Sequence, residues 1–242
     1  MTYCVGLKMD RGLIFMSDTR TNAGLDNIST FSKMHVWSRE GDRLIVLLSA
    51  GNLATTQAVI GRLDEQIRIE EPGKPSLMQT ASMFQTAQLI GTTVKEVIRD
   101  AAPAGQTADA FAASFILGGQ IRGDEPRLFY IYPEGNFIES SPDTPFFQIG
   151  EHKYGKPIIV RAYDRKMSDE DAIKLLLVSF DSTLKSNLSV GLPLDMHLYR
   201  ADSFARGVSK RFERNDPYYV AISEGWSDAL RSAFHSLPAL AL

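Results

Sequence analysis

The sequence predicts an α+β fold, built as a layered sandwich, and the order of its segments supports this. Strand-like segments come in consecutive hairpins and helical segments come in groups between them, which favours stacked antiparallel sheets covered by helices. The strand–helix alternation and the glycine-rich phosphate loop of a nucleotide-binding sheet are not found. No linker divides the 242 residues, so we expect one domain over residues 1–242.

Two hairpins and two long helices are expected in the first half of the chain. Strand composition is found at residues 3–9, 13–16, 31–37 and 43–48, and residues 49–52 should end the last strand. Gly12 allows the tight turn of the first hairpin, and the strand after it is apolar on both faces, as in a sheet covered on two sides. Apolar residues at helical spacing then predict a helix over residues 53–70, and a second one from an N-cap at Ser76 to residue 100.

Strands and a third helix are expected in the second half. Ser168 and the acidic residues after it form a variant of the capping box, which predicts a helix over residues 169–188. A loop is expected before this helix, at residues 148–155. The predicted strands are at residues 110–117, 127–131, 136–138, 194–199 and 218–222.

The composition excludes several classes of protein. A net charge of −3 without a Lys/Arg cluster argues against a nucleic-acid partner, and no apolar stretch approaches the 18 residues of a membrane span. The first residues lack the basic and apolar segments of a signal peptide, and Cys4 is the only cysteine, so we expect a cytoplasmic protein without an intramolecular disulfide. Cys4 lies in an alternating strand, where a small buried thiol is expected and not a nucleophile.

No metal or organic cofactor is expected. The four histidines are far apart and lack the spacing of metal ligands, so surface positions or hydrogen-bonded core positions are expected for His35, His152, His197 and His235.

The start of the chain offers a nucleophile. Methionine aminopeptidases remove Met1 when the next residue is small, which would leave Thr2 with a hydroxyl and a free α-amine. An α-amine has a pKa of roughly 7.7–8.0, so part of it is an unprotonated base near neutral pH. Threonine with its own amine is a recognised pair of nucleophile and base, although a Met-Thr start is common by itself. Asp18 ends an apolar strand, and a buried carboxylate there needs a partner.

Several motifs, taken together, resemble a proteasome β-subunit. They are Thr2, the segment Ser17-Asp18-Thr19-Arg20, Lys33 one residue earlier than the family places it, and the Ala50-Gly51 turn into the first long helix. The resemblance extends to about residue 200, and residues 17–22, 149–156 and 186–195 are most similar to Anbu, the bacterial proteasome-like family related to HslV. It implies the four-layer α-β-β-α sandwich of N-terminal nucleophile hydrolases and a threonine-type endopeptidase.

The resemblance also implies a role for each site residue. Thr2 Oγ would attack a peptide carbonyl and form an acyl-enzyme ester, with the Thr2 amine as the base. Lys33 would lie beside Thr2 and favour the deprotonated hydroxyl and amine, and Asp18 would pair with Lys33. The N–H of Gly51 would stabilise the oxyanion, while Arg20 would be structural. The pocket for the residue before the scissile bond would be lined by Thr21, Phe31, Ser49 and Leu53.

Two positions depart from the family pattern. Glu151 replaces the accessory serine before the third helix, and Asn187 replaces the accessory aspartate near the end of that helix. Val190 takes the place of the second serine, unless Ser189 fills it through a one-residue shift. A carboxylate and a carboxamide can still organise a water and bind the amine. The charge of Glu151 would raise the pKa of the amine, however, which makes the amine a poorer base at neutral pH.

Three functions remain open on the sequence. The first is a threonine peptidase acting on a peptide or protein substrate as a homo-oligomer, a ring or spiral stacked through helices, with an ATPase or adaptor partner left open. The apolar segments of residues 3–48 and the paired helices are expected to carry surplus surface for those contacts. The second is a non-catalytic scaffold, which the retained catalytic set opposes. The third is an amidase of the same nucleophile class that acts on a small amide or an isopeptide. A chain that keeps Met1 is expected to be inert, because its Thr2 nitrogen is an amide.

Overall fold

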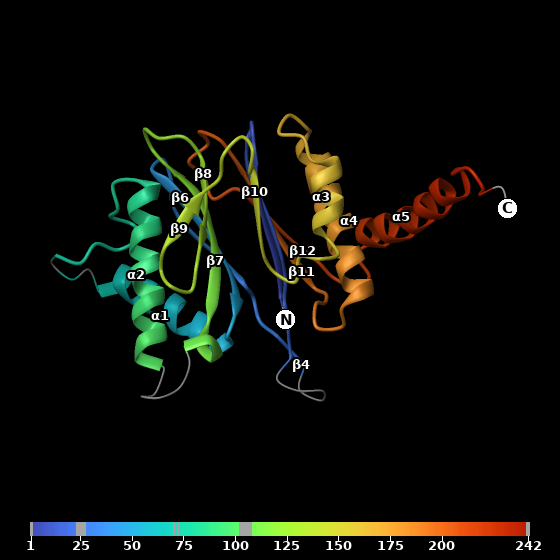
Figure 1. Cartoon of the computed structure of the whole chain (residues 1–242). Coiled ribbons are helices and arrows are strands. Elements are labelled where there is room, and N and C mark those ends of the chain that lie inside the picture. Colours follow the sequence, from blue (N-terminus) through green and yellow to red (C-terminus); the bar gives the residue numbers. More distant parts are fainter. Residues whose placement is uncertain (1, 23–27, 70, 72, 102–107, 241–242) are drawn as a thin grey trace.

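The computed structural model describes residues 2–22, 28–69, 71, 73–101 and 108–240. Within these residues, two five-stranded antiparallel sheets stack face to face between two layers of helices (Figure 1). The central strands of each sheet are buried on both faces, because each sheet is covered by the other sheet on one side and by helices on the other. This confirms the α-β-β-α sandwich.

The first sheet has the N-terminal hairpin near its centre. Its strand order is β10-β1-β2-β11-β12. Cys4 pairs with Ser17 across the hairpin, and Leu194 pairs with Asp18 on the other side of β2, so both neighbours of β2 reach its carboxyl end. The strands are β1 (Tyr3–Met9), β2 (Gly12–Asp18), β10 (Phe146–Gly150), β11 (Leu194–Arg200) and β12 (Val208–Phe212).

The second sheet runs in the order β5-β6-β7-β8-β9, which leaves β5 at an edge. A small two-stranded pair formed by β3 (Arg20–Asn22) and β4 (Ile28–Thr30) lies outside both sheets. The strands of the second sheet are β5 (Met34–Arg39), β6 (Arg43–Gly51), β7 (Ala113–Ile121), β8 (Arg127–Ile131) and β9 (Phe137–Glu139).

Helices cover the outer face of each sheet. Helices α1 (Leu53–Ile69) and α2 (Met83–Ala101) pack on the second sheet through the apolar stripes that the sequence predicted. Helices α3 (Lys156–Ala162) and α4 (Asp169–Ser186) lie on the first sheet, and Ser168 caps α4 by accepting a hydrogen bond from the N–H of Asp171. No helix of the described residues is both long and apolar enough to cross a membrane.

The second helix begins later than predicted. The expected N-cap, Ser76, starts a buried turn, and α2 begins at Met83 after Ser82, whose Oγ accepts a hydrogen bond from the N–H of Gln85 at 3.2 Å. The guanidinium of Arg43 donates to the carbonyls of Leu77 and Thr80 at 3.2 and 2.8 Å. This long-range contact holds the intervening residues as turns, and no local pattern encodes it.

The predicted strand at residues 218–222 is wrong, because these residues lie in helix α5 (Pro217–His235). Asp216 is its N-cap and accepts from the N–H groups of Tyr218 and Tyr219, and Pro217 occupies the first turn.

Other boundaries also differ: β5 starts at Met34, β6 continues to Gly51, and β10 takes up the first residues of the predicted loop. The start of the predicted strand at 110 is instead part of a 3-10 turn, η1 (Ala108–Phe111).

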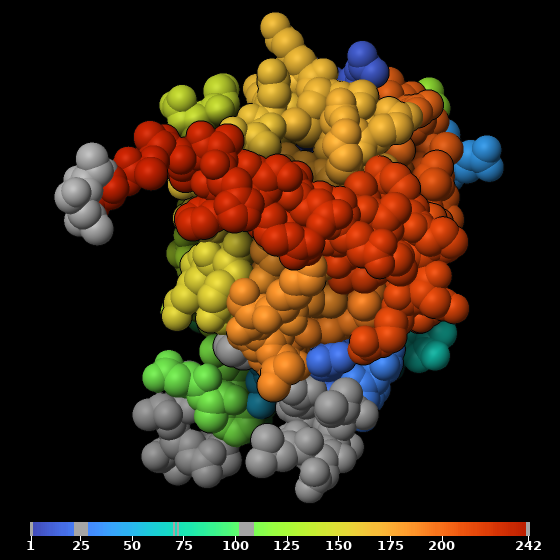
Figure 2. All heavy atoms as spheres, turned by 90° about the vertical axis from the view of Figure 1, so that its right-hand side faces the viewer, coloured from blue at the N-terminus to red at the C-terminus, as the bar shows by residue number. Residues whose placement is uncertain are grey.

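Exposed large apolar side chains are found on and after α5, and also on the paired helices, where Ile69 and Phe84 are 55% and 50% exposed. The strands within residues 3–48 are largely buried in the core of the subunit. Helix α5 crosses the outer face of the α3–α4 layer, and its end projects beyond the body (Figure 2). Every residue from Asp228 to Leu240 is exposed, including Leu230, Phe234 and Leu237.

Candidate functional site

The N-terminal threonine is fixed by backbone contacts at the start of β1. The carbonyl of Thr2 accepts a hydrogen bond from the N–H of Glu151 at 2.6 Å, and the next N–H, that of Tyr3, donates to Asp18 Oδ1 at 3.0 Å. Gly150 pairs with Tyr3 and has a φ of +81°. A Cβ on Gly150 would lie 1.9 Å from the Thr2 carbonyl oxygen, so this close approach requires glycine. Thr2 itself is 9% exposed.

Asp18 and Lys33 form a buried ion pair beside Thr2. Lys33 Nζ lies 2.7 Å from Asp18 Oδ1 and also donates to the carbonyl of Arg20 at 2.6 Å. Burial raises the pKa of the Asp18 carboxyl, and the Lys33 ammonium and the N–H groups of Tyr3 and Gly191 oppose this rise. The predicted pairing of these two residues is thus present. The further contact of Lys33 with Thr2 Oγ stays a prediction.

Arg20 ties the end of β2 to the segment after α4. It donates to the carbonyl of Leu188 at 2.8 Å, and its guanidinium passes so close to Gly191 that a Cβ there would lie 2.2 Å from Arg20 Cζ. Thr19 Oγ1 donates to the carbonyl of Pro193 at 2.8 Å. These contacts agree with the structural role expected for Arg20, because they bring residues 187–193 next to Asp18.

The two positions that depart from the family pattern contact each other. Asn187 Nδ2 donates to Glu151 Oε2 at 3.1 Å, and Glu151 Oε1 accepts from the N–H of Lys153 at 3.1 Å. Ser189 Oγ donates to Asn187 Oδ1 at 2.5 Å, so Ser189 belongs to this network. Val190 is buried in the core. Glu151, 8% exposed, carries this network directly to the Thr2 backbone through its own N–H.

The turn from β6 into α1 forms one wall of the cleft that Thr2 also lines. Gly51 ends β6 with a φ of +119°, and a Cβ there would lie 2.3 Å from the carbonyl oxygen of Ala112. Asn52 then caps α1, because its Oδ1 accepts from the N–H of Thr55 at 3.1 Å. Backbone geometry at Gly51 therefore requires glycine independently of any catalytic role.

A cleft of about 950 Å³ opens between Thr2, β5 and α1, and we call it the Thr2 cleft. All four pocket residues that the sequence predicted line it, together with Lys33 and Gly51. Asp18, Glu151, Asn187 and Ser189 lie behind Thr2 and not in the cleft wall. The cleft also includes residues to which the sequence assigned no role in the site: Ser32, His35, Ala50, Asn52, Thr56, Gln57, Ile60, Gly61, Asp64 and Gly150.

Simple periodicity could have found several of these residues. His35 follows Lys33 at the two-residue spacing of one strand face. Gln57, Ile60 and Asp64 follow Leu53 at spacings of four, seven and eleven residues, which keeps them on one side of a helix.

Cys4, His197 and His235 do not line the Thr2 cleft. Cys4 is fully buried, its Sγ lies 3.6 Å from the carbonyl of Ser49, and burial raises the pKa of its thiol, so it is a poor nucleophile. His197 is buried with Nδ1 2.8 Å from Ser209 Oγ, whereas His235 is exposed on α5. The described residues contain no cluster of side chains that could hold a metal ion.

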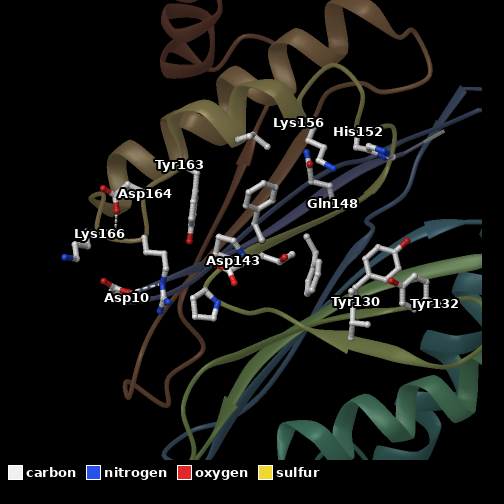
Figure 3. A pocket seen from close by; sticks show the side chains of 18 residues that line it. Asp10, Tyr130, Tyr132, Asp143, Gln148, His152, Lys156, Tyr163, Asp164 and Lys166 are labelled. Carbon is white, nitrogen blue, oxygen red and sulfur yellow. Dashed lines mark hydrogen bonds and ion pairs between the residues drawn. The ribbon is translucent and has the colours of Figure 1, made fainter.

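A second cavity, of about 1040 Å³, lies away from Thr2 (Figure 3). Asp10 lines it just beyond the end of β1 that is opposite to Thr2, and Lys156 and Tyr163 face it from the α3 side. Tyr130 and Tyr132 face it from the second sheet. Because Thr2 does not line this cavity, we assign it no part in the chemistry.

Comparison with known proteins gives consistent matches, which cover most of the chain for the family model and the curated relative and nearly all of it for the solved structures. A family model described as "Proteasome subunit" matches residues 2–192. The "Proteasome subunit beta" of Methanocaldococcus vulcanius is 25% identical over 191 residues, which cover 78% of either chain. Among solved structures, Anbu from Yersinia bercovieri is 48% identical, with a TM-score of 0.93 over 100% of both chains. Anbu from Pseudomonas aeruginosa, described as a helical assembly, is 45% identical, with a TM-score of 0.93 over 99% of this chain and 98% of that one.

Proposed function

Because this chain belongs to the proteasome subunit family and is similar to Anbu over its whole length, we propose that it is a proteasome-like peptidase whose nucleophile is the Thr2 hydroxyl. The observation that carries the proposal is the placement of Asp18. One carboxylate oxygen binds both the Lys33 ammonium and the N–H that follows Thr2. The same buried group therefore holds the candidate cation and the backbone N–H next to the candidate nucleophile.

The proposed reaction uses only groups of this chain and water. After removal of Met1, the Thr2 amine accepts the proton of Thr2 Oγ as the hydroxyl attacks a peptide carbonyl. The N–H of Gly51 donates to the oxyanion, and the amine passes the proton to the departing amine. Water then cleaves the acyl-enzyme ester and restores the hydroxyl. The positive charge of Lys33 favours the unprotonated amine and the alkoxide.

The substrate class can be tested by comparing the hydrolysis of peptides with the hydrolysis of small amides. A cleft of about 950 Å³ that is open along β5 suits a peptide chain better than a small amide, which leaves most of it empty. We expect the Met1-free protein to hydrolyse unstructured peptides with a kcat/KM at least about tenfold above that for single-residue amides. Chromatography of a peptide library and of amides and isopeptides measures both. Faster turnover of small amides would instead favour the amidase, and no turnover of either would favour the scaffold.

Glu151 is expected to set the pH at which the amine works. A buried carboxylate near the Thr2 amine raises the pKa of that amine, so Glu151→Gln should lower it by up to about one unit. Because the base must be unprotonated, the acid limb of the pH profile of kcat/KM should move to lower pH by the same amount. The exposed residue Glu170 is the matched control, and Glu170→Gln should leave the profile unchanged. A shift to higher pH in Glu151→Gln would contradict this assignment.

A homo-oligomer built partly through α5 is the assembly that we propose. Leu230 and Phe234 are four residues apart on α5 and are 50% and 71% exposed, and Leu237, just past the end of the helix, is 66% exposed; together they form an apolar stripe at the end of α5 without cover in the described chain. Such a stripe on a projecting helix fits a second copy of this chain. The description of the Pseudomonas aeruginosa Anbu as a helical assembly supports self-association in a similar protein.

Sedimentation velocity tests this assembly. The double variant Leu230→Glu/Phe234→Glu should shift the protein from large species towards the 26.8 kDa subunit at micromolar concentration, because two charges would have to be buried in the contact. Ser232→Glu adds a charge on the other side of the same helix and should leave the sedimentation profile unchanged. A wild-type protein that sediments only as the subunit would contradict self-association.

A further inference from the structure

The Thr2 cleft extends past the residues that were expected to hold the substrate side chain. Lys33, just before β5, and His35, on β5, line the cleft, and Trp37 follows at the same two-residue spacing and packs against the apolar cluster that includes residues of α1. From Lys33 to Trp37, four strand residues span roughly 13 Å. The far end is formed by Asp64 of α1, whose Oδ1 accepts a hydrogen bond from Trp37 Nε1 at 2.7 Å. The cleft is therefore a long groove with Thr2 at one end and a carboxylate at the other.

The side of α1 that faces the groove is open at Gly61. Gly61 lies in the groove wall, and a Cβ added there would meet no atom within 4 Å. Together with Gln57 before it, this gives a side chain entering from Thr2 an open path towards Asp64. The path has apolar walls near its entrance, where Leu53 and Phe31 lie.

Asp64 differs from the other charged residues of its helix. Arg62 pairs with Asp100 on α2 at 2.9 Å, and Arg68 lies 3.7 Å from Glu65. Asp64 has no ion-pair partner within the described residues. It is also the one carboxylate among the described residues that line the groove. Its hydrogen bond to Trp37 fixes one oxygen and leaves the other for a ligand.

Lys33 and His35, which also line the groove, do not neutralise the negative charge of Asp64. Lys33 is already paired with Asp18 at 2.7 Å. Burial lowers the pKa of His35, and the carboxylate of Asp64 opposes this change. An imidazole with a lowered pKa is neutral at physiological pH, so it can accept a hydrogen bond without repelling a cation. The far half of the groove therefore has a net negative charge.

We propose that this groove selects peptides in which the residue before the scissile bond is arginine or lysine, with Asp64 as the specificity-determining residue; the inference rests on the proposed peptidase function. An extended arginine or lysine side chain reaches about as far as two strand residues, roughly 6–7 Å. Its apolar stem would pass Leu53 and Phe31, and its cation would arrive at the level of His35 and Gln57. Asp64 then attracts it across the remaining distance, directly or through water.

Binding can be measured without any reaction. The chain has two tryptophans, so Thr2→Ala combined with Trp226→Phe leaves Trp37 as the single indole and a direct reporter of the groove. Two otherwise identical peptides are compared, one with arginine and one with citrulline before the scissile bond; citrulline keeps the shape of arginine and lacks its charge. We expect the arginine peptide to change Trp37 fluorescence at a concentration about three- to tenfold lower.

Matched substitutions identify the charge responsible. Asp64→Asn keeps an oxygen that can accept from Trp37 Nε1 and should bring the arginine-to-citrulline ratio close to one. Glu65→Gln makes the same change of charge on the next residue of the helix, which does not line the groove, and should leave the ratio unchanged. A ratio near one in the unsubstituted groove, or the same ratio in Asp64→Asn, would overturn the proposal.

The same peptides separate this inference from the proposed peptidase function. The Met1-free protein with Thr2 intact should hydrolyse both peptides, with a kcat/KM ratio that follows the binding ratio in every variant. Hydrolysis of both peptides at equal rates would overturn the selectivity and leave the peptidase in place. Selective binding by the Thr2→Ala form without any hydrolysis by the intact form would overturn the peptidase and leave the groove assignment in place.

Discussion

Substitution of Thr2 by alanine is expected to lower kcat/KM for peptides by at least about a thousandfold while the protein stays folded. The hydroxyl is the atom that forms the ester, so no other group of the site can replace it. The two contacts that fix this segment are made by the backbone: the carbonyl of Thr2 accepts from the N–H of Glu151, and the N–H of Tyr3 donates to Asp18. Alanine at position 2 keeps both contacts. Kinetics with a peptide substrate and thermal unfolding measure the two outcomes. Thr92→Ala, an exposed position on α2, is the control and should change neither.

Retention of Met1 should abolish activity to a similar extent. In that form the Thr2 nitrogen is an amide, and the proposed base is lost. Mass spectrometry should therefore find the active species one methionine lighter than the encoded chain, and an electrophilic probe should label Thr2 only in this species. Equal rates of hydrolysis by the two forms would show that the base is another group. Cys4 would not readily replace Thr2, because its thiol is fully buried and its pKa is raised.

Local sequence signals were sufficient for the parts of the fold and site that depend on neighbouring residues. The hairpin at Gly12 follows from turn chemistry, and α4 follows from its cap at Ser168. Asp18 was expected to have a partner because it ends an apolar strand, and Lys33 is that partner. The motif resemblance assigned Glu151 and Asn187 to the accessory positions of the site, and the structure adds that they are hydrogen-bonded to each other.

The errors have two sources: a local helix-start signal that was outweighed by strand composition, and a distant contact that local rules do not show. Residues 218–222 have the composition of a strand, yet Asp216 and Pro217 before them are helix-start signals, and these local signals prevailed. The start of α2 was misplaced because Ser76 and Ser82 are equally good caps by local rules. Only the contact of Arg43 with Leu77 and Thr80 makes the first of them a turn. The role proposed for Asp64 depends on which way its helix faces, which composition does not reveal.

Substitution of either Asp18 or Lys33 alone should destabilise the protein, whereas substitution of both should restore most of the stability. Lys33→Met leaves the Asp18 carboxylate buried without a cation, which is expected to lower the free energy of unfolding by about 3–5 kcal/mol. Asp18→Asn leaves the Lys33 ammonium in the same position and should cost a comparable amount. The double variant removes both charges, so most of the stability should return. Urea denaturation of the four proteins measures the coupling.

Activity should not return with stability in the double variant. We expect kcat/KM to fall by about a thousandfold or more in all three variants, because each lacks the positive charge, or the group that aims it, beside Thr2. Arg68→Met removes one partner of an exposed ion pair and should alter stability far less, without an effect on turnover. A double variant that regains both stability and activity would mean that the pair serves only the fold. Stability regained without activity is the result expected if a buried charge is kept at an energetic cost because the Thr2 hydroxyl and amine need it.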